Sequence, residues 1–290
     1  MFRYLLLIYF IINLSFSQDT INFKQYDSLK TSAEDKHKSI INKKDPDNFD
    51  VRMFRSINSK RSSFKDAVLP YFDRSAPPLA FIMPMSTLIY GRLSKNHYDE
   101  NTGYLLGISE GLNLFLTFGT KYIVKRNRPY ASLDKVYCKD NIGTDPYSFP
   151  SGHTSIAFSI AAMFNLRYPK YPQVYVPMYL YGIIVAYGRP YFGMHYSSDL
   201  LGGALIGAGS SILVYSLRST LFKMKNKILS EEIEDAGSIN GNTIAIFGGA
   251  FVASSLLGQV LFDDNNKVRL NISPYGSNNE MINFNINVRF

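Results

Sequence analysis

The pattern of hydrophobic and polar positions predicts a mostly helical protein. Five apolar stretches fill the middle of the chain, and loops rich in proline, glycine and charge separate them. These stretches are residues 77–90, 104–124, 154–166, 174–187 and 198–217. The pattern therefore predicts an all-α fold in which the helices pack as a bundle.

The same pattern is compatible with a bundle in a membrane and with a soluble bundle. Glu110 and Asn113 interrupt the second stretch, the third and fourth are short, and the mean hydropathy is −0.07. The last stretch carries Gly202-Gly203 and Gly207-x-Gly209, a small-residue face typical of membrane helices, although small residues also pack soluble bundles tightly. We favour a membrane-embedded or membrane-docked bundle over a freely soluble one.

The amino-terminal region has the pattern of an export signal. Arg3 precedes an apolar run at 4–14, and Ser-Phe-Ser at 15–17 is a small-x-small cleavage pattern. An uncleaved anchor is the alternative, but the run is short for a full span. Residues 1–17 are therefore expected to be a signal peptide and residues 18–50 a polar, loosely ordered leader. The helical domain is expected to cover residues 51–230.

The carboxy-terminal region, residues 231–290, changes character. An acidic stretch leads into three segments, 243–252, 268–273 and 281–290, and the last alternates strictly between polar and apolar residues. The pattern predicts a small antiparallel β appendage of unknown role. Its terminal aromatic residue is also typical of outer-membrane barrel chains, but three strands cannot close a barrel.

Charge and cysteine content narrow the classes of partner. The formal net charge is +8, yet the basic residues are spread along the chain and no nucleic-acid motif is present. We expect no nucleic-acid partner, and the charge suits an anionic substrate or an anionic membrane surface. The single cysteine, Cys138, excludes an internal disulfide.

Two short segments carry groups that bind an oxyanion. Lys121 and Arg128 are seven residues apart, and on one helix this spacing would let both cations reach the same anion. Pro150-Ser151-Gly152-His153 precedes an apolar run, as at a helix N-terminus whose free N–H groups bind an anion.

A third segment adds a histidine that a carboxylate can orient. Arg189 precedes His195, and Asp199 lies one helical turn beyond that histidine, where its carboxylate can fix the ring tautomer. Cations, a helix N-terminus, two histidines and an orienting carboxylate together predict a phosphoryl-transfer site. No cluster of Asp, His or Cys has the spacing of metal ligands in the sequence.

The three segments resemble the three-part signature of the type 2 phosphatidic acid phosphatase family, which shares its site with class A acid phosphatases and vanadium haloperoxidases. The matches are Lys121-x6-Arg128-Pro129, then Pro150-Ser151-Gly152-His153, then Arg189-x5-His195-x3-Asp199. One position departs from the signature, because Gly188 stands where the family usually has serine. The resemblance covers residues 57–217.

The resemblance implies a role for each matched residue. His195, held by Asp199, would attack phosphorus and form a phosphohistidine, and His153 would act first as acid and then as base. The phosphoryl oxygens would be bound by Lys121, Arg128, Ser151, Gly152 and Arg189. It implies neither a metal nor a cofactor.

Two further groups of residues lie beside the motifs. Lys125 would fall near the face of Lys121 on a continuous helix, where a charge on the rim of the site is expected. Aromatic residues also cluster there and serve either as core or as the wall of an apolar pocket. They are Tyr130, Tyr147, Phe149, Tyr191, Phe192 and Tyr196.

These observations together predict a metal-independent phosphatase of phosphate or pyrophosphate monoesters in the cell envelope. It would be periplasmic or membrane-associated, with its active site on the non-cytoplasmic side. Lipid phosphates such as phosphatidate, polyprenyl phosphate or lipid A are the favoured substrates. A broad acid phosphatase for small soluble esters is the alternative, and a vanadium-dependent haloperoxidase, whose family members are typically longer, is a third. The sequence does not indicate an oligomeric state.

Overall fold

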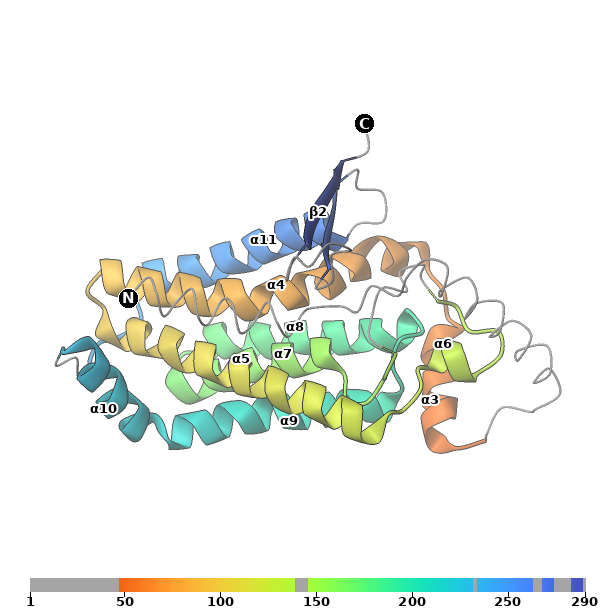
Figure 1. The fold of residues 1–290 in the computed structure, drawn as a ribbon, viewed down its shortest axis with the longest axis horizontal. Helices are drawn as coiled ribbons and strands as arrows, with labels where there is room; N and C mark the ends of the chain where they lie inside the picture. Colours follow the sequence, from red (N-terminus) through yellow and green to blue (C-terminus); the bar gives the residue numbers. More distant parts are fainter. Residues whose placement is uncertain (1–46, 139–145, 232–233, 263–267, 274–282, 289–290) are drawn as a thin grey trace.

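The computed structural model describes residues 47–138, 146–231 and 234–262, together with the backbone of two strands. The all-α prediction is confirmed for the main body, which is a bundle of long helices (Figure 1). The helices are α3 (Phe49–Asn58), α4 (Ser63–Leu93), α5 (His97–Val124), α6 (Pro129–Ser132), α7 (Gly152–Arg167), α8 (Pro172–Tyr191), α9 (Ser197–Ser216), α10 (Arg218–Leu229) and α11 (Gly241–Phe262). The strands are β1 (Val268–Ser273) and β2 (Asn283–Val288).

The helix α4 is much longer than the predicted stretch at 77–90. It contains four prolines, which normally end a helix because each lacks an N–H group and clashes with the preceding turn. The helix nevertheless continues, because it packs along α5 and α11 over its length and tertiary packing outweighs local preference. Ser75 Oγ also lies 2.9 Å from Tyr181 Oη of α8.

The helix α7 lies at the centre of the bundle and packs against α5, α8 and α9 (Figure 1). Its contact with α9 is very close. A Cβ atom on Gly203 would lie 2.4 Å from the carbonyl oxygen of Ser151, and one on Gly207 would lie 2.0 Å from that of Ser155. Only glycine at these two positions lets the backbones approach this closely.

The predicted strand at 243–252 is wrong, because this segment lies inside α11. Its β-branched residues favour a strand, but residues 241–262 form a continuous stretch of 22 residues without a charge, which suits a buried or membrane helix better. The helix packs along α4, where Gly258 lies against the carbonyl of Arg74. Beyond it, β1 and β2 pair antiparallel, with Val268 opposite Val288.

The amino-terminal leader is described only at its end. The predicted signal peptide and most of the leader, residues 1–46, lie outside the described residues. Phe49 and Asp50, assigned to the leader from sequence, instead begin α3, whose N-cap Asn48 accepts a hydrogen bond from the backbone N–H of Val51. The helix lies at the same end of the bundle as α6 (Figure 1).

At the end of the bundle opposite α3, polar contacts join α7 to α5 and to the segment before α11. Arg167, the last residue of α7, is buried and forms two hydrogen bonds of 2.7 Å with the carboxylate of Asp235, which lies between α10 and α11. Its Nε atom donates to Thr102 Oγ1 of α5 at 2.9 Å. The segment leading into α11 is therefore tied to the central helix.

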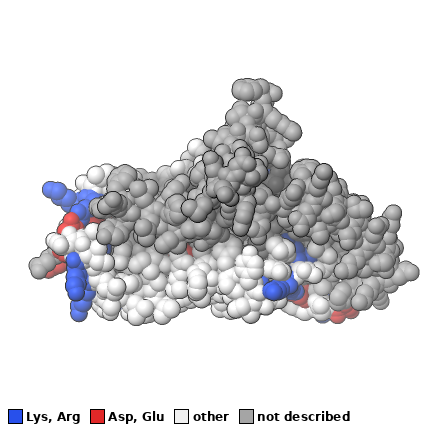
Figure 2. Space-filling model, viewed as in Figure 1, with Lys and Arg blue, Asp and Glu red and all other residues white. Residues whose placement is uncertain are grey.

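The flank of the bundle is apolar. Figure 2 shows a broad uncharged band between charged groups at the two ends of the molecule. Large apolar side chains on the outer helices point into solvent, including Phe115 on α5, Leu205 on α9 and Leu256 on α11. Two of the described helices, α9 and α11, have the length and composition of a membrane span.

Candidate active site

The three motifs meet at one end of the bundle, where four long helices begin or end. Lys121 is in the last turn of α5, Gly152 and His153 are in the first turn of α7, and Arg189 is in the last turn of α8. His195 lies in the short loop before α9. Lys121, Arg128 and Arg189 are all close enough to influence the charge of both His153 and His195.

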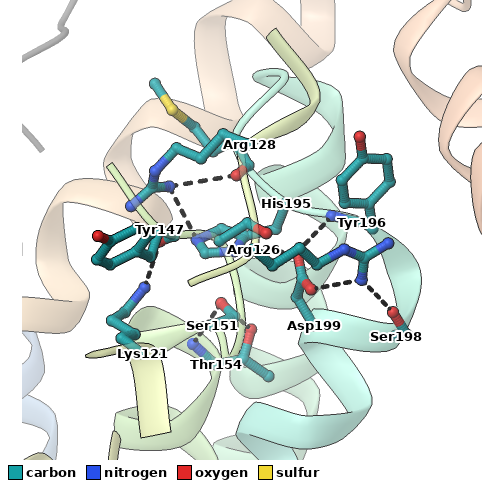
Figure 3. A network of polar contacts seen from close by, with 12 residues as sticks. Lys121, Arg126, Arg128, Tyr147, Ser151, Thr154, His195, Tyr196, Ser198 and Asp199 are labelled. Atoms are coloured by element: carbon teal, nitrogen blue, oxygen red, sulfur yellow. Dashed lines mark hydrogen bonds and ion pairs between the residues drawn. The ribbon is translucent and has the colours of Figure 1, made fainter. Parts of the chain in front are cut away.

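The helical spacing argument for Lys121 and Arg128 is wrong, although the two cations do come together. The helix α5 ends at Val124, and Lys125 takes a left-handed conformation with φ 50° that turns the chain. Arg128 therefore lies beyond the helix, as the N-cap residue of α6. Lys121 Nζ donates to the carbonyl oxygen of Tyr147 at 2.7 Å (Figure 3). The cations converge because the loop folds back over the helix end.

The ring of His195 lies between Arg128 and Asp199 (Figure 3). Arg128 Nη1 is 3.2 Å from His195 Nε2 and 3.2 Å from the carbonyl of Met194. A guanidinium only donates, so Nε2 accepts and carries no proton. The proton is then on Nδ1, which is 3.6 Å from Asp199 Oδ2. Burial, with Arg128 next in effect, holds the pKa of His195 well below its usual range, so the ring is neutral.

Ser151 and Gly152 form the start of α7. Ser151 Oγ accepts from the backbone N–H of Thr154 at 3.4 Å, which makes it the N-cap residue. Its own N–H donates to the carbonyl of Asp199 at 3.0 Å, so the second and third motifs are joined through the backbone. The positive end of the α7 dipole therefore faces the site.

Arg189 has a partner that the sequence did not indicate. Its Nη1 atom is 2.5 Å from Asp73 Oδ1 of α4, while its buried Nε atom has no hydrogen-bond partner among the described atoms. At the neighbouring Gly188, a Cβ atom would lie 3.6 Å from the ring of Phe192, which is ordinary van der Waals contact. The backbone therefore has room at this position for a Cβ atom, which the serine usual in the family would add.

The aromatic residues beside the motifs are largely packed against the protein. Tyr191 and Phe192 belong to one buried cluster, and Tyr196 packs on Phe54 of α3 in another. Tyr147 contacts Tyr122 edge to face, with ring centroids 5.8 Å apart. These contacts favour a role in the core for the buried members of the group.

Three polar residues of the site were missed from sequence: Asp50, Arg126 and Ser198. Arg126 fills a variable position of the first motif, yet it binds Asp199 directly (Figure 3). No local pattern marks it, because its partners are 72 to 76 residues away along the chain. Among the described residues, no group of three His, Cys, Asp or Glu side chains is placed to hold a metal ion.

Part of the chain is similar to known proteins. Residues 102–223 match the family model of the PAP2 superfamily. An undecaprenyl-diphosphatase from Sulfolobus acidocaldarius is 27% identical over 176 residues, which cover 59% of this chain and 80% of that protein. A lipid A 4'-phosphatase from Bacteroides thetaiotaomicron is 26% identical over 184 residues, which cover 59% of this chain and 78% of that protein.

A solved structure is also similar. The crystal structure of LpxE from Aquifex aeolicus has a TM-score of 0.48 and 24% identity, and the match covers 58% of this chain and 96% of that one. The matched segment of the family model contains all three motifs. Residues 102–223 are therefore similar to the PAP2 superfamily, in agreement with the resemblance of the three motifs.

Proposed function

We propose that the chain is a metal-independent phosphatase that hydrolyses lipid phosphates through a phosphohistidine. The observation that carries this proposal is the unprotonated Nε2 atom of His195, held among three cations at the N-terminus of α7. A neutral imidazole nitrogen is a nucleophile, and the surrounding positive charge attracts a phosphate. The similarity to an undecaprenyl-diphosphatase and a lipid A phosphatase supports a lipid substrate.

The first chemical step transfers the phosphoryl group to the enzyme. His195 Nε2 attacks phosphorus as the bond to the ester oxygen breaks, and His153 gives a proton to the leaving oxygen. A histidine surrounded by cations holds such a proton only when a phosphate anion offsets their charge. The substrate therefore supplies part of the charge balance that makes His153 an acid.

The second step returns the enzyme to its starting state. His153, now neutral, takes a proton from water while the water oxygen attacks phosphorus and the P–N bond breaks. Inorganic phosphate leaves, and His195 keeps its proton on Nδ1 beside Asp199. In both steps Lys121, Arg128 and Arg189 would bind the equatorial oxygens.

The setting of the site supports a membrane substrate. The apolar flank of the bundle and the two candidate spans favour an embedded protein, with the site at one end of the helices. The export pattern at residues 1–17 supports a site that faces away from the cytoplasm. A lipid phosphate in the outer leaflet would reach this end directly.

The test is a substrate comparison with purified full-length protein in detergent, with and without EDTA. We expect kcat/KM for a long-chain phosphatidate to exceed that for p-nitrophenyl phosphate at least tenfold, with no loss in EDTA. His195→Ala should lower kcat by more than about 100-fold. A preference for the soluble ester would favour a broad acid phosphatase, and a loss in EDTA that magnesium restores would contradict the metal-independent route.

A further inference from the structure

The carboxylate of Asp199 has a partner on each side. Oδ2 accepts from the backbone N–H of Tyr196 at 2.8 Å and faces His195 Nδ1. Oδ1 accepts from Arg126 Nη1 at 2.8 Å (Figure 3). Because both oxygens are held, the carboxylate cannot rotate freely, and the direction in which it faces the histidine depends on Arg126.

Arg126 is itself fixed on several sides. Its Nη1 atom is also 2.6 Å from Ser198 Oγ, and its Nη2 atom is 2.6 Å from Asp50 Oδ2. The guanidinium lies over the ring of Tyr196, with its carbon 3.9 Å from the ring centroid. A planar group held at both ends and stacked on a ring has little rotational freedom.

Asp50 connects this arrangement to α3. Its Oδ1 atom accepts from the backbone N–H of Ser198 at 2.9 Å, and Oδ2 accepts from Ser198 Oγ at 2.6 Å. Burial tends to raise the pKa of Asp50, but the hydrogen bonds from Ser198 and Arg126 outweigh burial and hold the pKa below its usual value. The carboxylate is therefore charged where it meets the N-terminus of α9.

The other end of α3 contacts the start of the third motif. Asn58 Nδ2 donates to the carbonyls of Pro190 and Tyr191, next to Arg189, at 3.1 and 3.2 Å. One helix of ten residues therefore contacts the third motif both before His195 and after it. This helix precedes the segment that matches the family model.

We propose that Arg126 and Asp50 are positioning residues that orient Asp199 toward His195, so that α3 is part of the catalytic apparatus. This inference rests on the proposed phosphatase function. Neither residue need touch the substrate. Asp50 contacts Arg126, Arg126 contacts Asp199, and Asp199 faces His195. Both residues therefore act on the nucleophile indirectly.

The experiment compares Arg126→Gln, Asp50→Asn and the double variant in the full-length protein. Arg126→Gln should lower kcat about 10- to 100-fold, the range typical for residues that orient a reactive group through another, with KM changed less than threefold. Asp50→Asn should lower kcat less, and the double variant should match Arg126→Gln because the two residues act in sequence. Arg126→Lys should recover only part of the activity, since lysine cannot bind both carboxylates at once.

The matched control is Arg52→Gln on the same helix, because Arg52 is exposed and pairs with Asp47 at the surface. It should retain wild-type kcat. The inhibition constant of inorganic phosphate reports whether each variant still forms the anion pocket, and it should stay within threefold of wild type. The phosphohistidine should also form more slowly in Arg126→Gln when measured by rapid quench with labelled substrate.

Two results would overturn the proposal. A rise in KM at constant kcat would mean that Arg126 binds the substrate, and a weakened phosphate inhibition constant in every variant would mean that the residues only support the fold. Absence of turnover in the wild type, by contrast, would remove the proposed function itself.

Discussion

At the scale of single residues, the chemistry depends on which nitrogen of His195 carries the proton. The cation at Arg128 and the carboxylate at Asp199 approach opposite sides of the ring. Together they select the tautomer in which Nε2 carries no proton and accepts from Arg128. Burial, with the same cation next in effect, lowers the pKa of His195, so the ring stays neutral in mildly acidic conditions.

This tautomer can be observed directly. The pKa of His195 lies well below its usual range, so the ring is expected to be neutral at pH 6.5. The contact with Arg128 then places its one proton on Nδ1. The chain has four histidines, so ¹⁵N spectra of histidine-labelled protein should be simple to assign, using His195→Gln to identify the signal. A doubly protonated ring at pH 6.5, or a proton on Nε2, would contradict the arrangement.

Residue identity was more predictable than residue environment. The resemblance to the three-part signature indicated Lys121, Arg128 and Arg189 as a group of cations, because the signature is read from residue types at fixed positions in the sequence. It did not indicate Asp73 as the partner of Arg189, nor Arg126 as the partner of Asp199. These pairs join segments far apart in the chain, and only the packing of the helices decides them.

At the scale of elements, the close contact between α7 and α9 holds the second and third motifs together. Gly203 and Gly207 face the backbone of α7, whereas nothing lies within 4 Å of a Cβ atom placed on Gly209. A Cβ atom on Gly202 would lie 2.6 Å from the ring of Phe149, so the small-residue face has a packing role at three of its four positions.

Gly207→Ala should destabilise the bundle by about 1–3 kcal/mol, because the new methyl group would overlap the backbone of Ser155 and force the helices apart. Gly209→Ala is the matched control and should be neutral or slightly stabilising, since alanine favours helix more than glycine does. Thermal unfolding in detergent measures both. Equal midpoints for the two variants would mean that α7 and α9 are not so closely packed.

The elements also show where pattern reading fails. The apolar stretch at 77–90 covers only the second half of α4, because charged residues interrupt the first half. The β-branched residues of 243–252 predict a strand, but for α11 length and continuous hydrophobicity are the better guide. The five main helices were found because their apolar runs are bounded by loops, which is a local signal.

At the scale of the whole molecule, the apolar flank predicts that the chain is inserted in a membrane. Leu205 is 74% exposed in the middle of α9. Leu205→Arg should lower the amount of protein recovered in carbonate-washed membranes, since a central arginine costs about 2.5–3.5 kcal/mol of insertion free energy. Leu205→Phe is the control and should behave as wild type. Recovery of the unaltered chain in the soluble fraction without detergent would contradict insertion.

The length of α7 has a consequence for how a substrate reaches the site. Its 16 residues span about 24 Å, less than the roughly 30 Å of a bilayer's hydrocarbon core. The helix is fastened at both ends, by Arg167 at one and by Ser151 at the other. In an embedded protein the phosphate pocket would therefore lie at the depth of the lipid headgroups rather than above them. A lipid could present its phosphate by lateral diffusion, with its acyl chains still in the bilayer.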